Sequence, residues 1–300
     1  MIRRSLRRCR LAAGAIQTKA NPERDALLLC HALEKGMGVP DPRKGFGREK
    51  AQRLVGTLKQ LETSGKSSSF AFREGLAVLK AYCDFQQQAG TPAPEIAKEA
   101  DALAEIYGLS CRGGCETVRG EALKKGSEFD FAAFAGSRHS MRAYSDEVVT
   151  KEEILEAVRM AKQCPSACNR QPWKFRYSLE PGICRAIMKA VPPQPFLEAI
   201  PYFGVVTVDK TLFGENETNQ WYVNGGIFLG YLSLAFHSLG IGSCCFQYEM
   251  FSKTELGLRN TLGIPEDEVI IAVLGYGKYP EEAKCILAER RPESEIAIEK

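Results

Sequence analysis

Several common catalytic and cofactor-binding signatures are absent from this sequence of 300 residues. It has no G-x-G-x-x-G after an expected strand and no G-x4-G-K-[ST], which excludes the usual dinucleotide fingerprint and the P-loop. Only three histidines are present, His31, His139 and His237, and G-x-S-x-G is missing, so a hydrolase triad is not expected. The chemistry must come from a cofactor that is bound in another way.

An excess of charge of one sign is also lacking. The chain has 40 Lys and Arg against 37 Asp and Glu, a formal net charge of +3, which provides no broad basic field for nucleic acid. The hydrophobic content of 44% and the length are enough for more than one average core. We therefore expect one full domain with a smaller region beside it, and no nucleic-acid partner.

Metal-binding cysteine pairs of the C-x2-C type are missing, although the sequence contains 11 cysteines. An odd number in a long chain without a secretory hydrophobic region does not indicate a disulfide framework, so we expect a cytoplasmic protein. The closest cysteine pairs are Cys111 and Cys115, Cys164 and Cys168, and Cys244 and Cys245. Buried, inert thiols are the prediction, and a metal site is the alternative.

The first 20 residues form a basic arm. Five Arg occur in the first ten positions, followed by an apolar patch at 11–16 that is too short for a signal sequence or a membrane span. We expect a solvated arm; attachment to anionic lipid or an Arg-rich presequence are the alternatives.

A helical region extends from Pro22 to about Gly126, because its apolar residues recur at spacings of three and four. After it, β-type stretches alternate with helices: WKFRYSL, then 203–209, then 268–277. This alternation predicts an α+β or α/β sheet domain. We divide the chain into a helical region 1–128 and a sheet domain 129–300.

A very apolar helix is expected from Asn219 to Leu239, between the last two strands. Asn224, His237 and several small residues interrupt it, so we expect no integral membrane segment but a helix that is buried or covered by a partner. The side chains expected to form an apolar patch on it are Ile227, Phe228, Leu229, Leu232, Leu234 and Phe236. Such a patch must be covered, either by a second copy of the chain or by the N-terminal helices.

Four polar side chains cluster just before a helix that starts with the capping box Thr150 to Glu153. They are Arg138, His139, Ser140 and Arg142. Two guanidinium groups and a hydroxyl at this spacing suit a phosphate. The alternative is a solvated helix boundary.

A second polar cluster lies in CPSACNRQPWKF, at a junction between a helix and a strand. Pro165 ends the helix, and the small Ser166 allows the backbone close to a flat ligand. Asn169 and Gln171 supply donors and acceptors, which need partners if they are buried. Packing explains Trp173 but not these amides, so the turn is predicted to contact a flavin or nucleotide.

A third basic pair, Arg290 and Arg291, follows the last strand. A C-terminal charge pair is usually solvent-exposed and is weak evidence by itself. Together with the other two clusters, it completes a phosphate site, a set of amides and a planar group. That combination favours a bound flavin or nucleotide.

These residues resemble the FMN-dependent nitroreductase family. SRHSMRAY is similar to its R-[RH]-S-x-[RK]-x-[FY] segment, and PSACNRQPW to its P-S-x-x-N-x-Q-P-W turn. The helix followed by GIGSC, the segment LGIPEDEVIIAVLGYGKYP and the final ERRP also look like family motifs. The resemblance covers about Phe134 to Pro292. The residues CFQYEM after GIGSC depart from it, so no group is assigned to flavin N5.

The resemblance implies an α+β nitroreductase-like fold with a mixed or antiparallel sheet flanked by helices, and FMN at the interface of a homodimer. The residues implied to bind FMN are Arg138, His139, Ser140, Arg142, Pro165, Ser166, Asn169, Gln171 and Arg290. No catalytic side chain and no metal are implied, since the flavin itself performs the chemistry.

The implied activity is an NADPH- or NADH-dependent reduction of nitroaromatic, quinone or related small molecules. Two alternatives remain: a flavoprotein of this fold that oxidises a bound intermediate or breaks down flavin, and a cofactor-free scaffold. The segment HALEKGMGVPDPRKGFG is similar to extensions on family members linked to bacterial surface polysaccharides.

Overall fold

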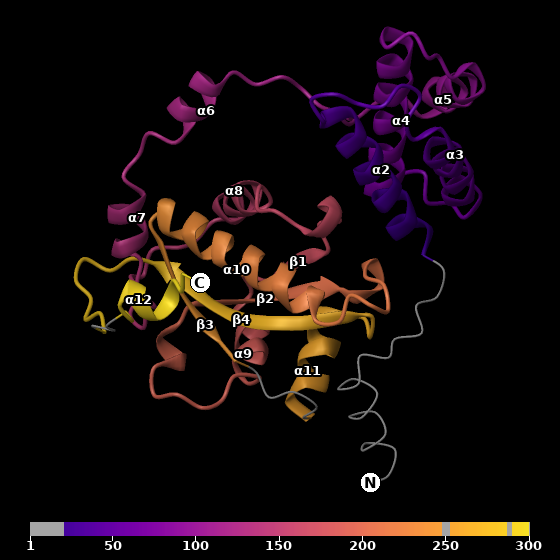
Figure 1. Ribbon diagram of the computed structural model, residues 1–300. Coiled ribbons are helices and arrows are strands. Elements are labelled where there is room, and N and C mark those ends of the chain that lie inside the picture. Colours follow the sequence, from indigo (N-terminus) through magenta and orange to yellow (C-terminus); the bar gives the residue numbers. More distant parts are fainter. Residues whose placement is uncertain (1–20, 248–252, 287–289, 300) are drawn as a thin grey trace.

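The structure is a computed structural model that describes residues 21–247, 253–286 and 290–299 (Figure 1). The basic arm predicted for 1–20 lies outside these residues. The helices that were expected between Pro22 and Gly126 are present, followed by a sheet with helices on both faces.

The N-terminal part is a bundle of four helices, α2 (Pro22–Gly38), α3 (Arg48–Thr63), α4 (Phe70–Gln88) and α5 (Pro94–Tyr107). Asn21 caps α2, because its side chain accepts from the backbone N–H groups of the first turn. The apolar stripes of the four helices meet in a core of their own, which includes Leu33, Leu54, Leu58, Phe72 and Leu79.

Two short helices, α6 (Gly120–Gly126) and α7 (Phe131–Ser137), lie on the segment that joins the bundle to the sheet. Figure 1 shows this segment as an arch that passes on the α8 and α10 side of the sheet. The division of the chain at residue 128 falls within this arch and stays a prediction.

The sheet is antiparallel with the order β1-β2-β4-β3. Its strands are β1 (Trp173–Tyr177), β2 (Tyr202–Asp209), β3 (Ile241–Phe246) and β4 (Glu268–Lys278). The predicted α+β class is confirmed. Strand β3 was not predicted, because its sequence IGSCCF contains a single β-branched residue and was interpreted as a helix end.

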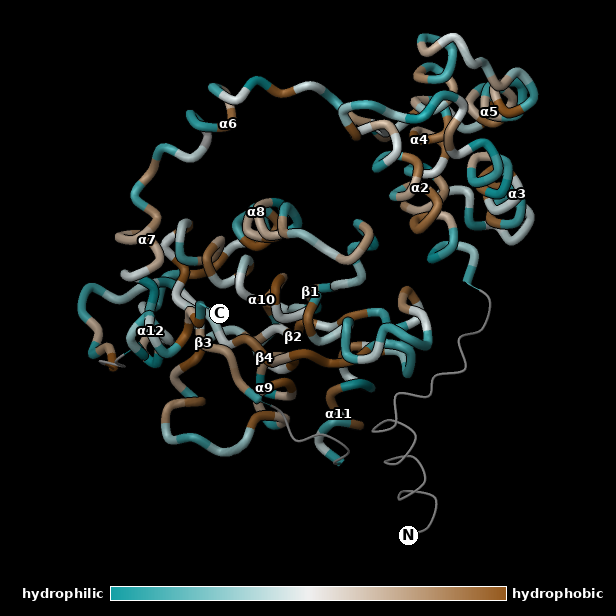
Figure 2. Tube along the Cα trace, in the orientation of Figure 1, coloured by the Kyte–Doolittle hydropathy of each residue, from teal (hydrophilic) through white to brown (hydrophobic). Residues whose placement is uncertain are grey.

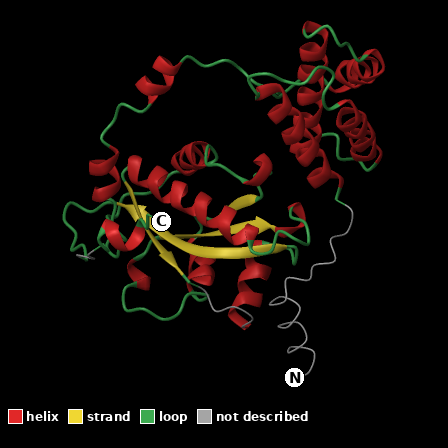
Figure 3. Cartoon of the chain, viewed as in Figure 1, coloured by secondary structure: helices red, strands yellow, loops and turns green. Residues whose placement is uncertain are grey.

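Helices cover both faces of the sheet, as Figure 3 shows. On one face lie α8 (Lys151–Ala161) and α10 (Gln220–Ser238); on the other lie α9 (Pro181–Met188) and α11 (Lys253–Leu262). The remaining short elements are η1 (Ala167–Asn169), η2 (Leu197–Ala199), η3 (Lys210–Leu212) and α12 (Glu293–Ile296).

Strand β2 is buried on both faces, which explains its almost continuous hydrophobic sequence. Val206 and Val208 face the α8 and α10 layer, whereas Phe203 and Val205 face α9 and α11, in the two-residue alternation of a strand. Much of β2 and β4 is therefore brown, the hydrophobic colour, in Figure 2.

The prediction of an apolar surface patch on α10 was wrong in its residues. Phe228, Leu232 and Phe236 are at most 1% exposed and face the sheet, so they do not form the surface patch that was predicted. Because α10 is apolar all round, its sequence could not show which side faces out. The open stripe consists instead of Tyr222, Val223, Gly226, Gly230 and Tyr231.

Close contact with the sheet explains one glycine of α10. A Cβ on Gly225 would lie 2.4 Å from Ile271, whereas one on Gly226 or Gly230 would meet no atom within 4 Å. No helix among residues 21–247, 253–286 and 290–299 is long and apolar enough to cross a membrane.

Candidate active site

The turn between α8 and β1 has an unusual backbone. Within four positions, Cys168, Asn169 and Gln171 all have positive φ values, of 50°, 51° and 46°. Non-glycine residues in this region cost on the order of 1 to 3 kcal/mol each and persist only where the surroundings enforce them. The turn predicted from the sequence is therefore a conformation that the rest of the domain must maintain.

Arg170 anchors this turn from within the protein. Its side chain is fully buried; it donates to the backbone oxygens of Ala167 (2.9 Å) and Leu212 (2.7 Å) and to Glu217 Oε2 (2.7 Å). The guanidinium also lies over the ring of Phe213, 4.7 Å from its centroid. This bonding to Arg170 lowers the pKa of Glu217, so the pair is ionised at neutral pH.

Asn224 holds the turn from α10. The backbone N–H of Ala167 donates to Asn224 Oδ1 (2.8 Å), and Asn224 Nδ2 donates to the carbonyl of Gln220 (2.7 Å). Within the turn, Gln171 N donates to Ser166 Oγ (3.1 Å), and the amide of Gln171 donates to Asn169 Oδ1 (3.2 Å). Asn169 and Pro165 are exposed, while Ser166 and Gln171 are half-buried.

The basic segment 138–142 lies along strand β3. Ser140 bridges Ser243 in parallel register, and Met141 N donates to the carbonyl of Ser243 (3.1 Å). Arg142 donates to the backbone of Ser140 (3.0 Å) and lies over the ring of Phe196. In the described part of the chain, neither Arg138 nor Arg142 forms an ion pair, so their positive charges are available to an anion.

His237, at the end of α10, connects the basic segment to the sheet. One ring nitrogen lies 2.8 Å from Ser137 Oγ and the other 2.7 Å from the Tyr279 hydroxyl. Burial lowers the pKa of His237, and the charges of Arg138 and His139 lower it further. His237 is therefore neutral at physiological pH and orients the residue that precedes Arg138.

The two clusters lie at opposite ends of one helix. Asn224, which holds the turn, and His237, which holds the basic segment, are 13 positions apart in α10. At 1.5 Å per residue they are separated by about 20 Å. The structure therefore collects the predicted residues into two half-sites and does not bring both together within one chain.

Arg290 comes after the residues of both half-sites in the sequence. It is exposed and begins the last described segment, which leads to α12. Its assignment to the phosphate stays a prediction.

The bundle contacts the turn through α2. Asn21 Nδ2 donates to Thr211 Oγ1 (2.9 Å) in η3, and α2 also packs against η1. Burial lowers the pKa of His31, and the nearby charges of Lys35 and Arg170 lower it further. One wall of the turn is thus made by the N-terminal region, which the sequence did not connect to the site.

Sequence reasoning did not single out Arg170 or assign a role to Asn224 and His237. Arg170 stands inside the recognised motif, but its partner Glu217 is 47 positions away and no pattern joins them. Asn224 and His237 did give a signal, because polar residues on an apolar helix need partners; this was interpreted only as evidence against a membrane span.

The cysteines lie in ordinary surroundings. All those described are free thiols, and burial raises the pKa of Cys164 to about 11 and also raises that of Cys244. Among the described residues, no group of three or more His, Cys, Asp or Glu could hold a metal ion. The prediction that the cysteines bind no metal stays a prediction.

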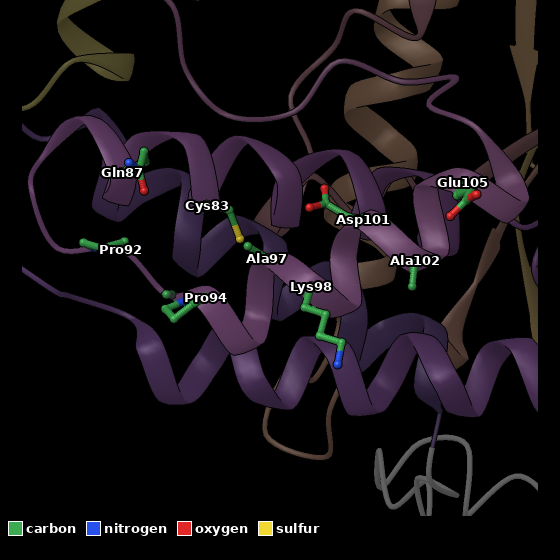
Figure 4. A pocket seen from close by; sticks show the side chains of 10 residues that line it. Cys83, Gln87, Pro92, Pro94, Ala97, Lys98, Asp101, Ala102 and Glu105 are labelled. Atoms are coloured by element: carbon green, nitrogen blue, oxygen red, sulfur yellow. The ribbon is translucent and has the colours of Figure 1, made fainter.

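A hollow of about 590 Å³ lies within the bundle, between α4 and α5 (Figure 4). Cys83, Ala97 and Lys98 are among its lining residues. It contains no residue of either half-site, so we do not assign the cofactor to it.

Comparison with known proteins links the site region to one family. The sequence profile of the Nitroreductase family matches residues 135–177, which contain the basic segment, α8 and the turn. An Archaeoglobus fulgidus protein that carries the name NADH dehydrogenase/NAD(P)H nitroreductase is 30% identical over 148 residues, 49% of this chain and 84% of that protein. One of the same name from Methanothermobacter thermautotrophicus is 29% identical over 160 residues, 53% and 81% of the respective chains.

A solved Bacillus subtilis structure, named as a nitroreductase, has a TM-score of 0.52 to this chain at 16% identity. It covers 57% of this chain and 99% of that one, and it supports the fold. The matches to these three proteins each span about half of this chain. The resemblance inferred from the motifs is confirmed: the chain belongs to the nitroreductase family.

Proposed function

We propose that the protein is an FMN-dependent NAD(P)H oxidoreductase that acts as a homodimer on nitroaromatic, quinone or related small-molecule acceptors in the cytoplasm. The observation that carries this proposal is the turn 165–171, in which three left-handed residues are fixed from behind by Arg170 and Asn224. Such an enforced backbone is typical of a ligand site. The names of the curated relatives support the reaction class.

The residues of the two half-sites fit FMN. Arg138 and Arg142 offer unpaired guanidinium groups to a phosphate, with Ser140 exposed between them. Ser166, Asn169 and Gln171 offer a narrow polar edge to a flat ring system. When bound, FMN supplies the hydride-transfer chemistry, and the side chains of the protein bind and orient it.

A second copy of the chain would complete the site. The open stripe of α10 contains Gly226 and Gly230 near its middle, so two copies of α10 can approach closely. If they pack antiparallel about a two-fold axis, the Asn224 end of one helix lies beside the His237 end of the other. The turn of one chain then faces the basic segment of its partner. The two half-sites, which are about 20 Å apart within one chain, would thus meet between the two chains.

The first test is an absorbance spectrum of the purified protein, which should show oxidised flavin. Mixing with NADPH should then bleach it within seconds. Flavin without bleaching would favour a non-reductase flavoprotein, and absence of flavin would favour the scaffold alternative.

The phosphate assignment is tested by Arg138→Ala. A charge-assisted hydrogen bond contributes about 1.5 to 3 kcal/mol, so FMN affinity should fall on the order of ten- to a hundredfold. Arg291→Ala is the control, because Arg291 is 79% exposed and pairs with Glu295 on the surface. Equal FMN retention after dialysis of both variants and the native protein would contradict the assignment.

A further inference from the structure

One side chain, Asn21, joins the bundle to the sheet domain by hydrogen bonds. Its Nδ2 donates to Thr211 Oγ1 (2.9 Å) and to the backbone oxygen of Thr211 (3.2 Å), 190 positions away in the sequence. Among the residues that the structure describes, no other hydrogen bond and no ion pair joins residues 21–114 to the sheet domain. The polar connection between the two regions therefore depends on this residue.

Thr211 belongs to the element on which the candidate flavin turn is anchored. The carbonyl of the next residue, Leu212, accepts from the buried guanidinium of Arg170 (2.7 Å). Asp209 Oδ1 accepts from the backbone N–H (2.9 Å) and from the hydroxyl (2.7 Å) of Thr211. Because the hydroxyl donates to Asp209, its oxygen is left to accept from Asn21. A continuous path thus leads from α2 through Thr211 to the acceptor of Arg170.

Helix α2 also lies against the turn itself. It packs against η1, which forms the middle of the turn, as well as against η3. Burial and the charges of Lys35 and Arg170 lower the pKa of His31, so this part of α2 is close to the anchor. At the end of the turn, Asp209 N donates to the carbonyl of Pro172 (2.8 Å). The bundle therefore contacts both the turn and the residues that hold it.

The conformation of the turn makes this support important. Cys168, Asn169 and Gln171 have positive φ values, which non-glycine residues keep only where their surroundings enforce them. A ligand that binds one conformation of a segment loses affinity in proportion to the fraction of molecules that leave that conformation. Each contact that fixes the anchors of the turn should therefore increase the affinity for a ligand bound there.

We propose that Asn21 is a positioning residue for the flavin site: through Thr211 it fixes η3, and with it the acceptor of Arg170, so that the bundle holds the turn 165–171 in the conformation that FMN binds. This inference rests on the proposed function. It gives the N-terminal region, which lies outside the residues matched by the family profile, a part in cofactor binding.

The test is Asn21→Ser. Serine caps a helix as well as asparagine does, so α2 keeps its cap, but the shorter side chain does not reach Thr211. FMN affinity should fall about three- to tenfold, the change expected for the loss of neutral hydrogen bonds. In flavin-free protein, hydrogen exchange of peptides from 165–171, measured by mass spectrometry, should be faster, because the bonded N–H groups of Ala167 and Gln171 lose protection when the turn opens.

Ser69→Ala is the matched control within the bundle. It removes the N-cap of α4, where Phe72 N donates to Ser69 Oγ (3.2 Å), and it touches no residue of the sheet domain. It should lower the melting temperature but leave FMN affinity and the exchange of 165–171 unchanged. If Ser69→Ala changes the turn as much as Asn21→Ser does, the effect follows the stability of the bundle, and the positioning role is overturned.

The two measurements separate this proposal from the proposed function. Native protein that binds FMN, with equal affinity and equal exchange in Asn21→Ser, overturns the positioning role and leaves the proposed function intact. Native protein that binds no flavin overturns the proposed function. The exchange of 165–171 in the two variants then decides by itself whether Asn21 holds the turn.

Discussion

The bundle and the sheet domain bury their charged groups in different ways. In the bundle, Glu74 is 8% exposed and faces a second carboxyl, Glu34; burial and this neighbour raise the pKa of Glu74 to about 7. In the sheet domain, Glu268 is 1% exposed but accepts from Lys174, Arg176 and Thr207. Burial alone would raise the pKa of Glu268, yet these hydrogen bonds outweigh it and lower the pKa.

The two regions therefore differ in whether their buried carboxyl groups have oppositely charged partners. The sheet domain satisfies its buried charges with fixed partners, and the same device, in Arg170 and Glu217, holds the turn of the candidate site. The bundle instead contains a carboxyl that gains or loses a proton near neutrality. We therefore expect substitutions to damage the sheet domain most, and pH to act most strongly on the bundle.

Arg170→Met should have the largest effect. It removes the partner of Glu217 and the donor to two backbone carbonyls, of which that of Leu212 is buried. Because Glu217 is 34% exposed, solvent partly compensates its carboxylate, and the loss of this buried donor and its hydrogen bonds costs on the order of 3 kcal/mol in total. The urea midpoint should therefore fall, and FMN should be lost with it. Arg159→Met is the control, because both members of its ion pair with Glu156 are exposed. Equal destabilisation by the two variants would refute the anchoring role.

Asn224→Ala should have the second-largest effect. It leaves the half-buried N–H of Ala167 without an acceptor, which costs on the order of 1 to 2 kcal/mol, and it frees the turn to relax. The loss of bound FMN should be larger than the decrease in folding stability alone would cause. Ser233→Ala, a control in the same helix, removes a bond to Leu229 O and a contact with Cys245 Sγ (3.8 Å), neither of which touches the turn, and should change flavin binding little. If both variants retain flavin equally, Asn224 does not support the turn.

Titration should distinguish the two regions. The folded-state pKa of Glu74 lies above its unfolded value of about 4.3, so its contribution is complete below that value and is lost as pH rises through about 7. Glu74→Gln should flatten the decrease in melting temperature between pH 5 and 8. For Glu268 the sign is opposite, because its pKa in the folded state is lowered: its stabilisation is present above the unfolded pKa and is lost as the pH falls through the lower folded pKa. Glu268→Gln should therefore change the melting temperature at acid pH. A wild-type melting temperature that is constant from pH 5 to 8 would argue against the bundle's titration.

The smallest effect is expected from the cysteines. Replacing Cys164, Cys168, Cys244 and Cys245 by Ser, one at a time, should leave most NADPH-dependent turnover intact, apart from packing losses at the buried positions. Raised thiol pKa values keep Cys164 and Cys244 protonated and unreactive at neutral pH. Stoichiometric zinc or iron, or inactivation by a chelator, would show that the cysteines have another role.

The sequence located the elements of the fold better than their pairing. Strands β2 and β4 were predicted because they are rich in β-branched residues, and β1 because aromatic residues alternate along it. Strand β3 was missed because its conformation depends on its partner: Cys244 and Cys245 pair with Gly275 and Leu274 of β4. The exposed side of α10 could not be predicted from the sequence either, because residues on every side of this helix are apolar.

For the candidate site, the motifs identified the turn and the basic segment but not what holds them. Positive φ at Cys168 and Gln171 cannot be predicted, because neither residue prefers that region. The contact of α2 with the turn depends on tertiary packing between distant segments, such as Asn21 and Thr211. Residues 248–252, which include the last three positions of the departing segment CFQYEM, lie outside the described residues, so no partner is assigned to flavin N5.

The strand order β1-β2-β4-β3 determines when each region can fold during synthesis. The bundle is complete at Tyr107, whereas β4, which pairs with both β2 and β3, begins only at Glu268, 161 residues later (268 − 107). At translation rates of about 5 to 20 residues per second, this delay is roughly 8 to 32 seconds. In the last part of it, between the completion of β2 at Asp209 and the start of β4, the apolar strand β2 lacks its central partner. The newly made chain is therefore most prone to aggregation in this period, after its bundle has folded.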